Sequence, residues 1–192
     1  MSAVPRYPVL RLSVEQYQAM RHARILGADD RVELLAGWLI ETQPRNPRHR
    51  AANRRLHAAL ESLVLADWHV ASRVAITTAD SEAEADMAIV RGKAGDFRNR
   101  HPGPEDVGLV VEIADATLEL DRDLKRAVYA RAGIGCYWIV NLLDGQVEVL
   151  EQPIWGPRDG YRRRRVFHRG ETVPVVVGGA RIGEIPVEQI LP

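Results

Sequence analysis

The sequence has a single cysteine, no excess of either charge and no long hydrophobic run. With Cys136 alone, the chain cannot form a disulfide framework or a cysteine-rich zinc site. Basic and acidic residues both number 26, so the strongly basic balance of many nucleic-acid-binding domains is absent. No apolar segment approaches the roughly 20 residues that a membrane-spanning helix needs. Because Met1–Leu12 also has no apolar stretch of signal-peptide length, we interpret the chain as cytoplasmic and soluble.

Several motifs that identify common active sites are also missing. The sequence contains no Gly-x-x-x-x-Gly-Lys-Ser/Thr phosphate loop, no Gly-x-Gly-x-x-Gly and no Gly-x-Ser-x-Gly nucleophile elbow. The six histidines do not have zinc-ligand spacing. We therefore look for a candidate site among charged residues that lie within apolar segments.

The chain does have the composition of a folded domain. At 192 residues, with 46% hydrophobic and 27% charged residues, it is predicted to form one domain over 1–192 with a packed core. The patterning predicts helices over 14–23, 48–66 and 120–132, and strands over 31–35, 38–41, 68–78, 85–90, 107–113, 136–140, 146–150, 161–167 and 173–177. This order predicts an α/β (α+β) fold built on one mixed sheet.

Two acidic residues interrupt apolar strand sequences. Asp86 lies within Ala85–Val90, and Glu112 lies within Leu109–Ile113. A carboxylate buried in a strand is costly unless it is paired or bound to a metal. Two such groups on neighbouring strands could share one divalent ion, since Mg²⁺ prefers oxygen ligands. The alternative is a carboxylate at a strand end that faces solvent or pairs with an arginine.

A cation follows on the next predicted helix. Asp121, Lys125 and Tyr129 are four residues apart and would share one helical face. Lysine is scarce, since Lys93 is the only other one. Lys125 could lean toward Glu112 and hold a nucleophilic water or offset phosphate charge. The alternative is a surface ion pair beside a half-buried tyrosine.

Several segments together resemble one family. They are Glu33 in Glu-Leu-Leu-Ala-Gly, Asp86, Glu112 in Leu-Val-Val-Glu-Ile, residues 120–134, and Tyr-Trp-Ile-Val-Asn at 137–141. The chain resembles the Uma-type restriction endonucleases of the PD-(D/E)XK nuclease superfamily, from about Ser13 to its C-terminus. The resemblance implies a restriction-endonuclease-like αβββαβ core flanked by helices, with an added N-terminal helix and β-hairpin and extra C-terminal strands.

The resemblance also implies roles for individual residues. Asp86 and Glu112 would be the metal carboxylates, and the carbonyl of Ile113 would point into the same site. Glu33 would be the upstream acidic catalytic residue that completes the site, approaching from the hairpin over 31–40; its alternative is an exposed strand residue. Lys125 would replace the lysine that classical members carry two residues after the second acid, where this sequence has Ala114. The implied cofactor is Mg²⁺ or Mn²⁺.

The implied partner is DNA, and the implied function is metal-dependent endonuclease cleavage. Arg48, His49 and Arg50 begin a predicted helix and could contact phosphates, or they could form a solvated face. Because the neutral chain predicts weak non-specific affinity, we expect a homodimer. Two alternatives stay open: a nuclease fold that no longer cuts and serves as a DNA-binding or partner-binding module, and a purely structural dimer.

Overall fold

The computed structural model describes residues 9–192 except 28, 65, 157 and 158. Residues 1–8 of the segment interpreted above as lacking a signal peptide lie outside the described part. Within the described ranges, every helix is too short or too polar to cross a membrane.

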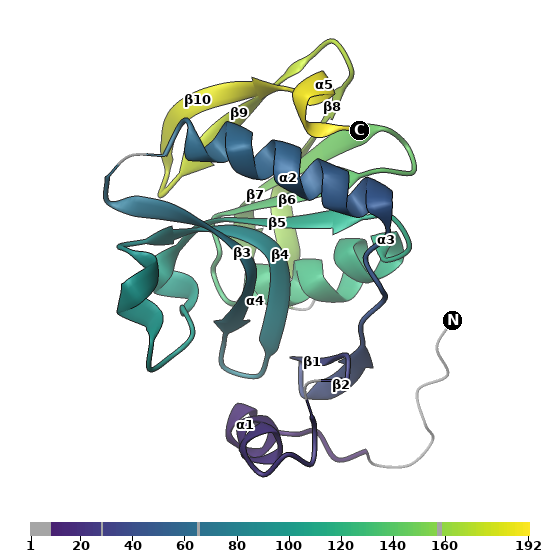
Figure 1. Ribbon diagram of the computed structural model, residues 1–192, viewed down its shortest axis with the longest axis vertical. Helices are drawn as coiled ribbons and strands as arrows, with labels where there is room; N and C mark the ends of the chain where they lie inside the picture. Colours follow the sequence, from purple (N-terminus) through teal and green to yellow (C-terminus); the bar gives the residue numbers. More distant parts are fainter. Residues whose placement is uncertain (1–8, 28, 65, 157–158) are drawn as a thin grey trace.

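An eight-stranded mixed sheet forms the centre of the molecule (Figure 1). Its strands are β1 (Val32–Leu35), β2 (Trp38–Glu41), β3 (Trp68–Thr77), β4 (Glu82–Arg91), β5 (Val107–Ala114), β6 (Cys136–Asn141), β7 (Gln146–Ile154) and β8 (Gly160–His168). The spatial order is β2-β1-β4-β5-β6-β7-β8, and β3 also pairs with β4. Strands β5 and β6 are parallel, whereas the other neighbours are antiparallel.

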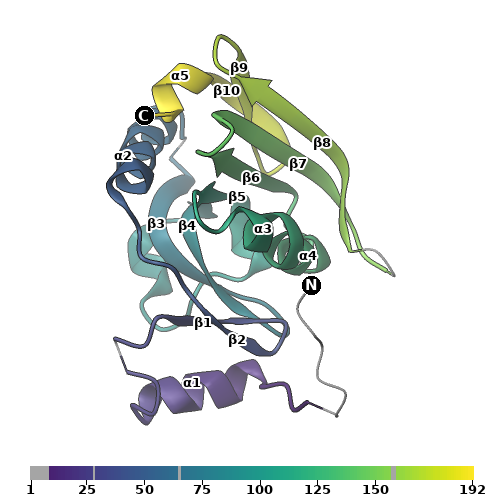
Figure 2. The ribbon, with the colours of Figure 1, turned by 90° about the vertical axis from the view of Figure 1, so that its right-hand side faces the viewer.

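Helices cover both faces of this sheet (Figures 1 and 2). The helical elements are α1 (Val14–His22), α2 (Pro47–Glu61), η1 (Ala94–Phe97), η2 (Pro104–Asp106), α3 (Leu118–Leu120), the π-helical turn η3 (Asp121–Lys125), α4 (Arg126–Arg131) and α5 (Val187–Ile190). A second sheet pairs β9 (Thr172–Val177) with β10 (Ala180–Pro186). Both views place α5 beside α2 at one end, and α1 with the β1–β2 hairpin at the other.

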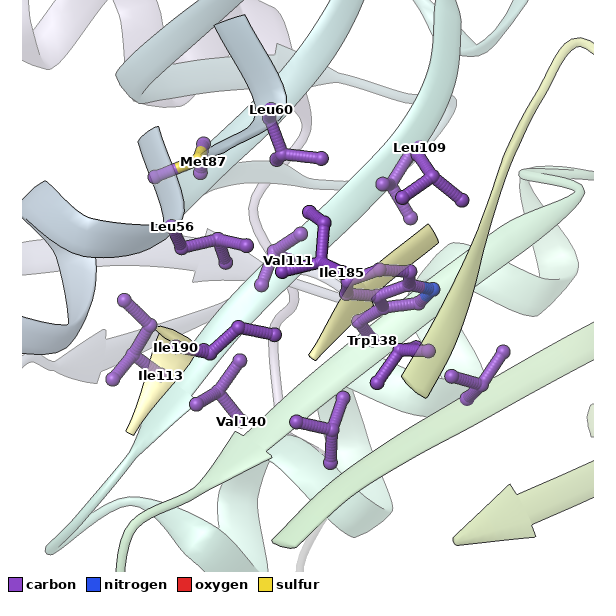
Figure 3. Close-up of a cluster of buried hydrophobic side chains, with 14 of the residues drawn as sticks. Leu56, Leu60, Met87, Leu109, Val111, Ile113, Trp138, Val140, Ile185 and Ile190 are labelled. Carbon is purple, nitrogen blue, oxygen red and sulfur yellow. The ribbon is translucent and has the colours of Figure 1, made fainter. Parts of the chain in front are cut away.

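The larger core lies between α2 and the sheet (Figure 3). Leu56 and Leu60 are four residues apart on α2, so they form a stripe that is fully buried. They pack in the same cluster as Met87 of β4, Val111 of β5 and Trp138 of β6. The cluster continues into β9, β10 and α5, which explains how the C-terminal segments are held against the sheet.

The alternate residues of the same strands face α4. Ala88, Val110 and Ile139 belong to a second buried cluster that includes Val128 and Tyr129 of α4. Since side chains alternate along a strand, both faces of β4, β5 and β6 are covered. This is why the sequence of β5 is a nearly continuous apolar run, as expected of a central strand.

The predicted α/β fold is confirmed, and α2-β3-β4-β5-α4-β6 forms the expected αβββαβ order. Some bounds differ. The helix predicted over 48–66 ends at Glu61, and Leu65 lies outside the described residues. The strand predicted over 85–90 extends over Glu82–Arg91, because polar residues at both ends pair with β3. The helix predicted over 120–132 contains the π-helical turn η3.

Close packing around Gly108 of β5 yields a test of this architecture. A Cβ atom there would lie 2.5 Å from Val177 Cγ1 and 2.8 Å from Trp68 Cζ3. We expect Gly108→Ala to lower the free energy of unfolding by about 1–3 kcal/mol in urea titrations, because the core would be overpacked. Gly135→Ala is the control, since nothing lies within 4 Å of the added atom. Equal stability of the two variants would contradict this packing.

Candidate functional site

Side chains from three strands and the π-helical turn meet at one small cavity. The cavity has a volume of about 70 Å³, and Glu33, Asp86, Glu112 and Lys125 all line it. These four charged residues are buried, with exposures of 2%, 6%, 3% and 5% in that order. The structure therefore brings together the four residues that the sequence singled out as a catalytic set.

Strand register explains how the two central acids meet. Met87 of β4 pairs with Val111 of β5 in antiparallel register. This is the last pair of the β4–β5 ladder; Asp86 and Glu112 are the next residues along the two strands, and both line the cavity. Glu33 comes from β1, where Val32 and Leu34 pack against α1 on the other side of the strand.

Lys125 joins two of the carboxylates. Its Nζ lies 3.1 Å from Glu112 Oε1 and 3.2 Å from Glu33 Oε1, and it donates a 3.5 Å hydrogen bond to the backbone oxygen of Glu84. These three contacts match the three donors of an ammonium group. Burial alone would lower the pKa of Lys125, but the charges of Glu112 and Glu33 raise it. The lysine is therefore charged at neutral pH.

Glu112 is held from two sides. The Tyr129 hydroxyl donates to Glu112 Oε1 at 2.7 Å, and Lys125 donates to the same oxygen. No described residue donates to Oε2, which stays available to a ligand. Burial raises the pKa of Glu112 well above its usual value; Lys125 lowers it, whereas Asp86 and Glu33 add to the rise. Three carboxyl groups, those of Glu33, Asp86 and Glu112, therefore share the cavity with the single ammonium of Lys125.

Asp86 has donors on both oxygens. Its Oδ2 accepts the backbone N–H of Ile113 at 2.9 Å and lies 2.9 Å from His49 Nε2. Its Oδ1 accepts Arg45 Nε at 2.8 Å. Burial would raise the pKa of Asp86, but His49, the Ile113 N–H and Arg45 hold it at about 2. Asp86 is therefore ionised despite its burial.

Ile113 was expected to offer its carbonyl to a metal. The contact seen is made by its amide nitrogen, which donates to Asp86. The N–H and C=O of one residue point to the same side of a strand. The carbonyl of Ile113 therefore faces β4 as well, and Ile113 lines the cavity.

His49 does not lie where the sequence analysis placed it. It was expected among surface contacts to phosphate, but its exposure is 7% and its ring meets Asp86. His49 belongs to the buried stripe of α2, where it lies seven residues, or two helical turns, before Leu56. One turn beyond His49, Asn53 Nδ2 donates to the backbone oxygen of Asp86 at 3.2 Å. Helical spacing from Leu56 would have predicted this inward position.

The two flanking arginines are exposed and point to different places. Arg48 donates to the backbone oxygen of Leu142 at 3.0 Å, which directs it toward the β6–β7 turn. Arg50 Nε donates to the backbone oxygen of Arg45 at 3.1 Å. Only Arg50 of this pair lines the groove beside the acidic cavity.

Asp121, Lys125 and Tyr129 were expected to share one helical face, and two of the three do meet at one acid. Lys125 and Tyr129 both reach Glu112, whereas Asp121 Oδ2 accepts a 2.7 Å hydrogen bond from the Thr117 hydroxyl. Burial raises the pKa of Asp121 to about 6. Asp121 and Lys125 are the first and last residues of the π-helical turn, and such turns are frequent at functional sites.

The chemistry of these donors fits a divalent cation. Among the described residues, no group of three or more His, Cys, Asp or Glu side chains is arranged to hold a metal. Mg²⁺ usually needs fewer, because it keeps several waters and binds one or two carboxylates. Asp86 and Glu112 provide two carboxylates and Ile113 a carbonyl at this cavity, where burial raises the pKa of Glu112 and the nearby acids add to the rise.

The chain matches both a family model and solved structures. A family model described as "Uma2: Putative restriction endonuclease" matches residues 14–183. A solved structure of a putative nuclease belonging to DUF820, from Anabaena variabilis, superposes with a TM-score of 0.66 at 11% sequence identity, covering 93% of this chain and 97% of its own. At that identity the likeness concerns the fold. None of the curated proteins compared with the chain matches it.

Proposed function

The chain belongs to the Uma2 family of restriction endonucleases, and we propose that it is a Mg²⁺- or Mn²⁺-dependent endonuclease that hydrolyses phosphodiester bonds in DNA. The observation that carries the proposal is the buried cluster of Asp86, Glu112 and Lys125. Lys125, held 3.1 Å from Glu112, supplies a fixed cation, and the ionised Asp86 supplies negative charge for a metal.

Each residue then has a distinct task. Asp86 and Glu112 would hold the divalent ion, which would supply Lewis-acid chemistry at the scissile phosphate. Lys125 donates a hydrogen bond to the attacking water or stabilises negative charge that develops on the phosphate. Glu33 keeps the Lys125 ammonium in place at 3.2 Å, and the Tyr129 hydroxyl fixes Glu112.

A nuclease fold that binds DNA without cutting it is the second candidate. One observation favours it: both oxygens of Asp86 already accept hydrogen bonds from protein groups. The two candidates differ in their response to a divalent cation. Only the enzyme converts substrate when Mg²⁺ or Mn²⁺ is added.

Plasmid cleavage tests the choice between them. We expect supercoiled plasmid to be nicked or linearised in Mg²⁺ or Mn²⁺, and to stay intact in EDTA, because chelation removes the Lewis acid. Linear duplex and single-stranded substrates extend the test to other DNA structures. If none of these substrates is cut with either metal, the enzyme proposal is wrong and the binding module is favoured.

An arginine-rich groove gives the DNA a path to the cavity. The groove has a volume of about 560 Å³, and Glu33 lines both the groove and the cavity. Its rim carries three exposed arginines from different parts of the fold: Arg31, just before β1; Arg50, on α2; and Arg73, on β3. We propose that this rim contacts phosphates on either side of the bond to be cut.

We expect Arg50→Ala to weaken DNA binding about equally for all sequences, because phosphate contacts carry no base information. The dependence of log affinity on log salt concentration should fall by about 1. Fluorescence anisotropy with labelled duplexes at several salt concentrations, in EDTA to prevent cleavage, measures both effects. Arg181→Ala is the control, since that arginine lies on β10 and pairs with Glu184. An unchanged salt dependence for Arg50→Ala would remove Arg50 from the interface.

A further inference from the structure

The guanidinium of Arg45 binds one oxygen of Asp86, a carboxylate proposed above to hold the metal. Arg45 lies between β2 and α2, and its Nε donates to Asp86 Oδ1 at 2.8 Å. Its Nη2 lies 3.0 Å from Glu84 Oε1. One arginine therefore bridges a buried acid of the cavity and a half-exposed acid of the groove.

The other oxygen of Asp86 has donors that cannot easily leave. Oδ2 accepts the backbone N–H of Ile113, which is fixed in the centre of the sheet. It also meets His49, whose side chain is 9% exposed and belongs to the buried stripe of α2. Only Oδ1 can turn to a divalent ion without breaking these contacts, and Arg45 is the donor on that oxygen.

Arg45, by contrast, can move. Its side chain is 30% exposed, and it lines both the cavity and the groove. A guanidinium stays protonated at any physiological pH. When a divalent ion approaches Asp86 Oδ1, the charge of Arg45 cannot be removed by deprotonation, so the side chain must swing away. The groove, which Arg45 also lines, has room for the displaced side chain.

We propose that Arg45 takes the place of the divalent ion at Asp86. Its guanidinium holds the Asp86 carboxylate in place until the ion binds, and then turns into the groove toward a DNA phosphate. The inference rests on the metal site of the proposed function. It adds a competition between a side chain of the protein and the metal for a single oxygen atom. That competition lowers the apparent affinity for the metal.

Direct metal binding tests the inference without requiring cleavage. Mn²⁺ titrations followed by electron paramagnetic resonance, without DNA, should show Mn²⁺ bound about 5- to 10-fold more tightly by Arg45→Ala than by the wild type. Arg73→Ala is the matched control, because it also removes one guanidinium charge. Arg73 Nε lies 3.4 Å from Glu84 Oε1, and Glu84 is the only described acidic residue that Arg73 contacts. Its effect on Mn²⁺ affinity should be less than half as large. Arg45→Gln replaces Arg45→Ala if the latter does not fold.

The outcomes separate the two proposals. If Mn²⁺ binds the wild type and Arg45→Ala binds it equally or more weakly, the inference is overturned and the metal site stands. If neither protein binds Mn²⁺, the inference and the metal site fail together. The Arg45→Ala, Asp86→Asn double variant is compared with Asp86→Asn alone. If Arg45→Ala still raises the Mn²⁺ affinity in that comparison, the ion does not bind at Asp86 and the inference is again overturned.

Discussion

Replacing Asp86 with Asn is expected to abolish DNA cleavage, with a loss of at least about 10³-fold in rate. In the proposed mechanism a divalent ion would contribute several kcal/mol to transition-state stabilisation, and each 1.36 kcal/mol corresponds to a factor of ten. Asn removes the negative charge that attracts the ion and keeps nearly the same shape. Single-turnover cleavage of a labelled duplex in saturating Mn²⁺ measures the loss.

Asn is the better probe than Ala because three donors converge on Asp86. Its amide oxygen can still accept the N–H of Ile113, and its amide nitrogen would face Arg45, which can move into solvent. We therefore expect a folded variant that loses about 1–3 kcal/mol of stability. Asp106→Asn is the matched control, since Asp106 also accepts a backbone N–H, from Gly103, and pairs with an arginine on the surface. Cleavage by Asp86→Asn at the Asp106→Asn rate would remove Asp86 from the site.

Much of the fold could be predicted from residue patterns because the core elements have distinct periods. The helix over Val14–His22 begins at a capping box, and β5 has the apolar sequence of a strand covered on both faces. Patterns were least informative at polar strand ends. Glu82 and Glu84 belong to β4 because they pair with β3, and that pairing depends on residues distant in the sequence.

The acids and lysine of the site could be found from the sequence because their burial is unfavourable without a function. Asp86 and Glu112 stood out as charged residues within apolar strands. The groups that position these acids were not recognised as such from the sequence, which assigned His49 to phosphate contacts. Arg45 lies in a loop with no regular pattern, and the role of His49 depends on α2 crossing the sheet beside β4. The π-helical turn that carries Lys125 also has no signal in helical periodicity.

Replacing Lys125 with Met is expected to lower the cleavage rate about 10²- to 10³-fold, the usual cost of removing one preorganised donor that stabilises a transition state. Met keeps the length of the side chain without its charge. Lys125→Arg should also be impaired, since a planar guanidinium does not reproduce a compact ammonium that meets three acceptors. Lys93→Met is the control, because the only other lysine is exposed. A folded Lys125→Met protein that cleaves at the Lys93→Met rate would show that the lysine has no part in the chemistry.

The stability of Lys125→Met separates its electrostatic role from its catalytic one. Without the ammonium, the buried carboxylates of Glu33 and Glu112 lose their shared partner, and breaking such a buried pair costs about 3–5 kcal/mol. A divalent ion at Asp86 and Glu112 restores positive charge to the same cavity, and a ligand that binds only the folded state stabilises it. We therefore expect Mn²⁺ to raise the thermal midpoint of Lys125→Met more than that of the wild type, while cleavage stays low. An equal rise in both proteins would mean that the ion and Lys125 do not neutralise the same charges.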